Sequence, residues 1–213
     1  RLNSFGAQGS QANRVGKASA AAGYVLNRME WGPWALTPGV RYEYVDYTTD
    51  NYGGSDPSRT GSALQTYHAV VQGLIPGVGV EYALNDSLTL LGGVHQGFAP
   101  PEAPSSAVSA DNAQEETSVK YEAGVRYATP VLSIDAIGYY TAYDNLLGSD
   151  TFSSGGAGGG DQFNGGKVDV YGLELALQTD AGQIFLFPSQ PQVRFPLRFS
   201  YTYTNATFQD AFN

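Results

Sequence analysis

The sequence contains no cysteine, a single methionine and little charge, since only 15% of its 213 residues are charged. The absence of cysteine excludes a disulfide scaffold and thiolate metal sites. What the chain has instead is 27 glycines and 15 tyrosines. Such a composition favours strands and turns over helices.

Long apolar runs are also missing. No run approaches the roughly 18 apolar residues of a transmembrane helix, so a β-barrel is the remaining way to span a membrane. The first seventeen residues contain no apolar core of a signal peptide, and we expect the chain to be a mature form or an internal piece of an exported protein. The net charge of −9, with Lys and Arg scattered singly, predicts that nucleic acid is not a partner.

Apolar and polar residues alternate with a period of two along much of the chain. This pattern predicts about eight strands. We place them at 18–30, 34–49, 68–84, 88–98, 118–128, 132–147, 166–178 and 197–209.

The alternation divides the strands into two faces. In the predicted hairpin 77–98, the apolar face carries Val78, Val80, Tyr82, Leu84, Leu88, Leu90, Val94 and Phe98. The opposite, polar face carries glycines and, along the strands, a ladder of ionised residues: Arg41, Glu43, Glu81, Lys120, Glu122, Arg126, Glu174 and Arg198. Such a ladder is costly against hydrocarbon and tolerable against water.

The connections alternate in length. Short turns at 31–33, 85–87 and 128–131 are separated by long polar loops at 50–67, 99–117 and 148–165. This predicts an up-and-down meander with short periplasmic turns and long extracellular loops. The connection 179–196 departs from the rule, and we expect it to hold a longer periplasmic excursion.

A soluble β-sandwich would show the same alternation. Three features together favour a membrane barrel: aromatic residues near strand ends, strands of about 9 to 14 residues, and the alternating loop lengths. We therefore predict an all-β fold, an antiparallel up-and-down transmembrane β-barrel, of which this chain supplies an arc.

Five segments carry a resemblance to a known family. They are WGPWALTPGVRYEYVDY (31–47), PGVGVEYALNDSLTLLGGVHQGFAPP (76–101), EETSVKYEAGVRYATPVLSIDAIGYYTAYDNLL (115–147), GGKVDVYGLELALQ (165–178) and FPLRFSYTYTNATF (195–208). In order and spacing they resemble the TonB-dependent outer-membrane receptors, in particular those of the ferric citrate type.

The resemblance implies a barrel of about 22 strands filled by an N-terminal plug, importing a ferric chelate such as ferric citrate or a siderophore with energy passed through TonB. Residues 1–213 would be an internal barrel segment without the plug and the terminal strands. TonB would then be reached only through the missing plug. The expected location is the outer membrane of a Gram-negative bacterium, with lipid and lipopolysaccharide against the barrel.

Candidate site residues are few. Arg59, His95, Gln96 and Lys167 could attract an anionic chelate at the mouth, although ordinary loop polarity explains them as well. His68 and His95 lie too far apart in sequence to form a metal constellation, so we predict no metal site and no cofactor. No catalytic motif is present, and no enzymatic activity is predicted.

Two alternatives stay open from the residues alone. One is a different outer-membrane barrel, porin-like or closed on itself with eight strands. The other is a soluble β-sandwich that binds glycans through loop aromatics such as Tyr52, Phe152 and Phe163.

Overall fold

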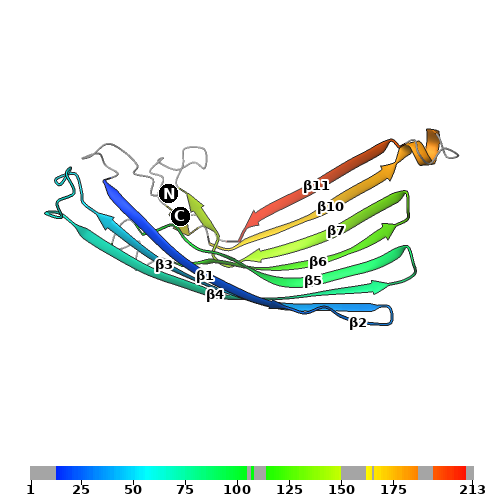
Figure 1. The fold of residues 1–213 in the computed structure, drawn as a ribbon, viewed down its shortest axis with the longest axis horizontal. Helices are drawn as coiled ribbons and strands as arrows, with labels where there is room; N and C mark the ends of the chain where they lie inside the picture. The colour runs from blue at the N-terminus through cyan, green and yellow to red at the C-terminus, as the bar shows by residue number, and fades with distance from the viewer. Residues whose placement is uncertain are drawn as a thin grey trace.

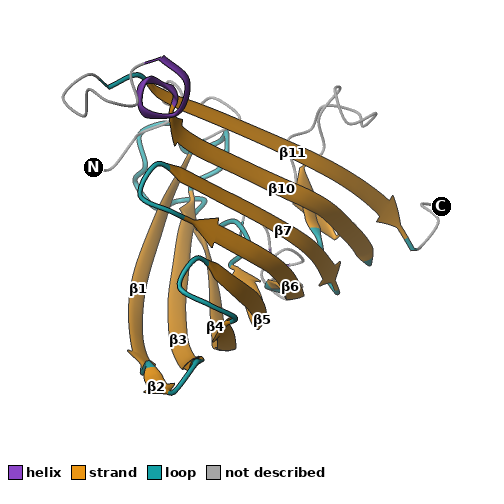
Figure 2. Ribbon diagram, turned by 90° about the vertical axis from the view of Figure 1, so that its right-hand side faces the viewer, coloured by secondary structure: helices purple, strands orange, loops and turns teal. Residues whose placement is uncertain are grey.

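A computed structural model of the chain describes residues 13–104, 107, 114–149, 162–164, 166–186 and 194–209. Nine strands form one curved, twisted antiparallel sheet (Figures 1 and 2). They are β1 (Arg14–Leu26), β2 (Met29–Trp31), β3 (Trp34–Asn51), β4 (Gln65–Ala83), β5 (Leu88–Ala99), β6 (Glu116–Ala128), β7 (Leu132–Tyr143), β10 (Val168–Asp180) and β11 (Pro196–Phe208).

The sheet is an up-and-down meander. Its order is β1-β3-β4-β5-β6-β7-β10-β11, with β2 continuing β1 along the same edge of β3. Each long strand therefore pairs with the next long strand in sequence, as predicted. Asn27 and Arg28 interrupt the β1–β2 edge.

The eight predicted strands are all present, with shifted ends. The largest shifts are in the predicted strand 18–30, since β1 runs from Arg14 to Leu26, and in the predicted strand 132–147, since β7 ends at Tyr143. Beyond it, β8 (Leu147–Ser149) pairs with β9 (Gln162–Asn164) in a separate two-stranded sheet. This small sheet was not predicted from the sequence, since three-residue strands are too short to show a period.

The short turns are fixed by their residues. Gly32 has a φ of 56° in the two-residue turn before Trp34, a left-handed conformation that suits glycine in a tight hairpin. At the next short turn, the side-chain Oδ1 of Asn85 accepts hydrogen bonds from the backbone N–H groups of Ser87 (2.9 Å) and Leu88 (3.0 Å). This bonding stabilises the turn locally.

The connection from β10 to β11 lies at the end of the sheet that carries the short turns (Figure 1). As expected, it is longer than those turns, and it contains a π-helix, η2 (Gly182–Leu186). Among the described residues, no helix has the length and apolar character needed to cross a membrane.

The apolar face of the sheet is bare. Leu74 on β4, in the same alternating row as Val78, is 61% exposed, and Phe199 on β11 is 60% exposed. A sandwich would press these rows against a second sheet, so the β-sandwich alternative is wrong for the described strands. Of its proposed glycan-binding aromatics, Phe152 and the side chain of Phe163 lie outside the described residues.

Aromatic residues gather at two levels of the apolar face. The rings of Trp34 and Tyr82 contact each other near the short turns in a tilted arrangement, with 4.5 Å between their centroids. Tyr121 and Tyr140 lie 6.3 Å apart closer to the long loops. Two such levels are the arrangement of interfacial girdles around a membrane barrel.

The buried core is small and sits on the polar face near the long loops. Val45 and Tyr47 of β3 pack there with Ala69 and Val71 of β4, and Phe98 packs against them. The assignment of Phe98 to the apolar face was therefore wrong. Pairing of β5 with β4 ends at Gly77 and His95. Beyond that point β5 diverges from β4, so the face on which a β5 residue lies no longer follows from the alternation along β4.

Candidate functional site

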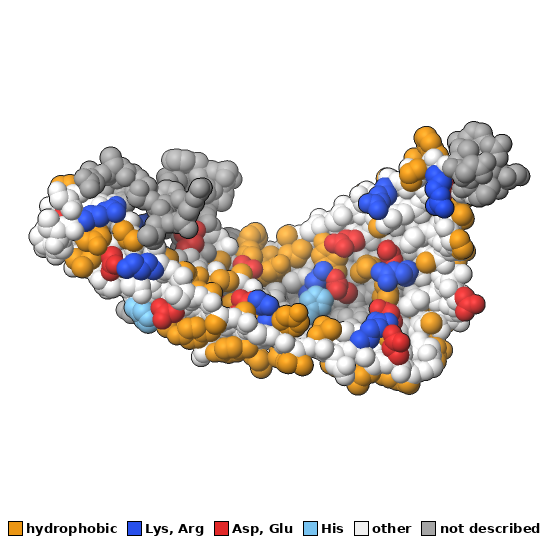
Figure 3. Space-filling view, viewed as in Figure 1, with side chains coloured by type: hydrophobic (Ala, Val, Ile, Leu, Met, Phe, Trp, Pro, Cys, Tyr) orange, Lys and Arg blue, Asp and Glu red, His pale blue; other side chains and the backbone are white. Residues whose placement is uncertain are grey.

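The ion-pair ladder lies on the polar face, where Lys, Arg, Asp and Glu side chains gather in and beside a hollow (Figure 3). Arg41 Nε donates to Glu43 Oε1 at 2.5 Å, and Lys120 pairs with Glu122. These pairs are partly exposed, so each contributes at most about 1 kcal/mol. The ion pairs make this face suitable for contact with water or polar ligands.

Two members of the ladder pair with residues that the sequence analysis did not single out. Arg28 Nη2 donates to Glu81 Oε2 at 2.9 Å, and Arg126 Nε donates to Asp135 Oδ1 at 2.7 Å. Asp135 could have been found, because it alternates with Ser133 on the predicted strand. Arg28 could not, because it lies in the interruption between β1 and β2 and follows no period.

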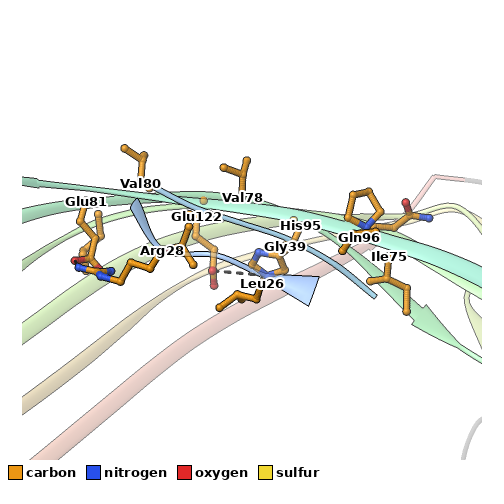
Figure 4. Close-up of a pocket in the computed structure, with 18 of the residues that line it drawn as sticks. Leu26, Arg28, Gly39, Ile75, Val78, Val80, Glu81, His95, Gln96 and Glu122 are labelled. Carbon is orange, nitrogen blue, oxygen red and sulfur yellow. Dashed lines mark hydrogen bonds and ion pairs between the residues drawn. The ribbon is translucent and has the colours of Figure 1, made fainter. Parts of the chain in front are cut away.

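A groove of about 670 Å³ runs along this face across β3, β4, β5 and β6 (Figure 4). His95 lies in it, with Nε2 3.7 Å from Glu122 Oε2. Arg28, Glu81 and Gln96 also line the groove. We call it the polar-face groove.

Glycines form much of the floor of this groove. Gly79 and Gly93 face each other across β4 and β5, and their neighbourhood has room for a side chain. Gly77 is different, because an added Cβ would lie 2.9 Å from the Cβ of His95. The glycines thus let another molecule approach the backbone closely and give His95 its position.

Arg59 is held in the loop between β3 and β4. Its Nε donates to Asn13 Oδ1 at 2.7 Å, and its guanidinium lies 5.7 Å from the centre of the Tyr52 ring. Arg59 has a φ of 52°, and among the described residues it is the one non-glycine with positive φ. Tertiary contacts therefore impose this conformation on the loop.

Asp56 organises the same loop. Burial raises the pKa of its carboxyl, but hydrogen bonds from the backbone N–H groups of Thr60, Gly61 and Ser62 and from the Thr60 hydroxyl outweigh burial and leave the pKa below its usual value. Asn13, which is 2% exposed, donates from Nδ2 to the Asp56 carbonyl at 2.9 Å. The loop is a compact unit tied to the start of β1.

Gln96 and Lys167 lie together elsewhere. Both line a groove of about 440 Å³ at the long-loop end of β6, β7 and β10. Lys167 Nζ is 3.1 Å from Asp144 Oδ1. The structure thus brings His95 and Gln96 into one groove and Gln96 and Lys167 into another, while Arg59 lies in a separate loop.

The arrangement offers hydrogen bonds and charges of both signs along one polar wall. The described residues contain no group of three or more His, Cys, Asp or Glu side chains that could hold a metal ion. A polar wall opposite a bare apolar wall with two aromatic levels defines an arc of a transmembrane β-barrel.

Comparison with protein families identifies the family to which this barrel segment belongs. The family described as TonB dependent receptor-like, beta-barrel, matches residues 1–213. The chain belongs to this family, as its sequence segments predicted. The family consists of receptors and not enzymes, and its barrels are outer-membrane proteins of Gram-negative bacteria.

Solved structures share the fold. The ferric citrate transporter FecA superposes with a TM-score of 0.66 at 22% identity, over 92% of this chain and 27% of FecA. The ferric-catecholate import receptor Fiu from E. coli gives 0.66 at 17%, over 94% and 29%. The siderophore receptor PiuA from Acinetobacter baumannii gives 0.67 at 16%, over 92% and 26%. The chain thus spans less than a third of each of these structures.

Proposed function

We propose that this chain forms part of the wall of an outer-membrane, TonB-dependent receptor that takes up a ferric chelate, of the ferric citrate or siderophore type. The observation that carries the proposal is family membership over residues 1–213, together with a charged wall opposite a bare apolar wall. FecA is a ferric citrate transporter, Fiu a ferric-catecholate import receptor and PiuA a siderophore receptor, and these relatives support the ligand class.

In this proposal residues 1–213 are one barrel segment of a longer receptor, and the plug and further strands belong to other parts of it. TonB acts through the plug. The apolar face, with Leu74 and Phe199 exposed, meets lipid, and lipopolysaccharide surrounds its long-loop end.

The ligand reaches the polar wall from the long-loop side. Arg59 and Lys167 lie at that end and attract an anionic chelate, while His95 and Gln96 offer hydrogen bonds further in. A ferric chelate brings its own donor atoms to the iron, so the wall needs hydrogen bonds and charge but no metal ligands.

The test compares two histidines in the receptor that carries this chain. His95→Ala removes a side chain of the polar-face groove, whereas His68→Ala removes one that pairs with Asp46 on the opposite side of the sheet. Since a hydrogen bond contributes about 0.5–1.5 kcal/mol, we expect His95→Ala to weaken binding of ferric citrate about two- to tenfold.

Uptake of iron-55 as ferric citrate and as a ferric catecholate is measured in cells that have this receptor as their sole iron importer. His68→Ala is expected to match the unmodified receptor. Absence of uptake with both chelates, at normal receptor abundance, would refute the ferric-chelate function. Equal effects of the two histidine variants would refute the role of the groove.

A further inference from the structure

Acidic residues are missing between Asp180 and Asp210. From residue 181 to residue 209 the sequence contains Arg194 and Arg198 but no Asp or Glu, although the whole chain has a net charge of −9. Arg194 lies two residues before β11, and Arg198 is the third residue of β11. Both are therefore at the end of the sheet that carries the short turns.

The two arginines line one groove of about 590 Å³. Its walls come from the β6–β7 turn, from the end of β10 and from the start of β11. Thr129, Ser133 and Thr179 also line it. We call it the rim groove.

The arginines of the rim groove have no carboxylate partner within ion-pair distance among the described residues, in contrast to Arg41, Lys120 and Arg126 of the ladder. Asp180 is the carboxylate that lines the groove, and its Oδ1 accepts hydrogen bonds from the backbone N–H groups of Gln183 (3.3 Å) and Phe195 (2.9 Å). One carboxylate against two guanidinium groups leaves the groove cationic.

The groove opens toward the polar face. Arg198 is in register with Gln178, which is in register with Ser133, and this row continues the polar face of β7, β10 and β11. Figure 3 shows Lys and Arg side chains at this rim on the same face as the ion pairs. A ligand therefore arrives from the hollow side or from the short-turn mouth, and the bilayer lies against the opposite face.

We propose that the rim groove binds an acidic polypeptide segment at the short-turn mouth of the barrel. Guanidinium groups bind carboxylates through paired N–H donors, and two of them along one groove suit a chain with spaced carboxylates. Pro130, Val131 and Pro196 add apolar contacts that a peptide uses and a small inorganic anion does not. The site does not depend on the ferric-chelate function.

The first experiment measures binding of a fluorescein-labelled hexaglutamate peptide, by fluorescence anisotropy, to the detergent-solubilised protein that carries this chain. Each exposed charge pair contributes little, so Arg194→Gln and Arg198→Gln should each weaken binding about two- to fivefold, and the double variant about tenfold. Arg126→Gln is the matched control, because it removes an arginine that already has a carboxylate partner, and it should change binding less than twofold.

Circular dichroism and resistance to heat denaturation in gels verify that each variant is folded. Binding that fails to appear, or that the double variant leaves unchanged, overturns the proposal. Inorganic phosphate or micelles of anionic phospholipid that displace the peptide at equal concentration would also overturn it, because the groove would then prefer phosphate.

A second experiment identifies the source of the acidic segment. A photo-crosslinking amino acid at Thr129, introduced in cells, should capture an acidic stretch either of the same polypeptide or of a second protein, and mass spectrometry separates these two cases. Either product supports the proposal if Arg194→Gln with Arg198→Gln abolishes it. Crosslinks only to lipid, or crosslinks that the double variant does not reduce, contradict it.

Discussion

Along the β3–β4 pair, each face of the sheet changes from one kind of side chain to the other between the short-turn half and the long-loop half. Toward the short turns, Tyr42 and Leu74 are paired on the bare apolar face. Toward the long loops, that same face carries Asp46, Asp50 and His68, while the other face buries Val45, Tyr47, Ala69 and Val71. The pairing runs without interruption from Trp34 to Asn51, so register does not cause the exchange.

This difference between the two halves indicates where along the strands the surroundings change from hydrocarbon to water. Hydrocarbon requires apolar side chains on the lipid side, and beyond the headgroups water allows polar ones there. From the exchange of side chains we infer that this boundary lies near Val45, which leaves the part of β3 from Val45 to Asn51 to extend about 20 Å beyond it. In this extension the sheet behaves like a soluble protein, with a small core on one face and exposed polar groups such as the Lys17–Asp50 pair on the other.

From the difference between the two halves of β4, we expect the largest effect on stability when a charge is placed on the apolar face. Val78 lies at the middle of the apolar part of β4, whereas Val70 lies on the same face of the same strand in the extension, and both are similarly exposed (41% and 44%). We expect Val78→Arg to reduce the stability of the folded barrel in lipid vesicles by about 2–4 kcal/mol.

Val70→Arg should change stability by less than about 0.5 kcal/mol, since its environment is water. Urea titration of folding into vesicles measures both. Equal losses would place the extension inside the bilayer.

A smaller effect is expected in the core of the extension. Val71 is 2% exposed, so Val71→Ala leaves a cavity and should cost about 2 kcal/mol in local stability. Its neighbour Val70→Ala should cost less than about 0.5 kcal/mol. Hydrogen exchange of the backbone amides of residues 65–71 reports this difference, and exchange that is unchanged in Val71→Ala would show that the cluster does not hold the extension together.

The smallest effect concerns acid. Because the hydrogen bonds of Asp56 hold its folded-state pKa below the ordinary value, its carboxylate stabilises the loop above about pH 4, and this stabilisation is lost as the pH falls through the lowered pKa. Amide exchange at Thr60 and Gly61 should therefore show less protection at pH 3 than at pH 6.

Asp56→Asn should remove this pH dependence, and Asp86→Asn in a short turn should preserve it. Protection at Thr60 that is equal at both pH values in the unmodified protein would contradict the role of Asp56.

Much of the fold follows from local pattern. The period of two located all eight long strands, and the loop lengths gave the meander, because in this topology each strand pairs with its neighbour in sequence. The exchange of faces in β3 and β4 was not predicted, because each strand was assigned one apolar and one polar face over its whole length. The site was less predictable: His95 was named as a candidate from the sequence, but its proximity to Glu122 depends on pairing between β5 and β6.

By itself the sequence determined the strands, their order and the two faces in the membrane zone, since a strand with alternating residues must separate them and short turns force neighbours to pair. Tertiary structure alone decided which charges meet and which glycines lie beneath side chains. Those outcomes depend on register and curvature across strands up to 65 residues apart, as in the bond between Tyr139 and Thr204, and no local pattern encodes them.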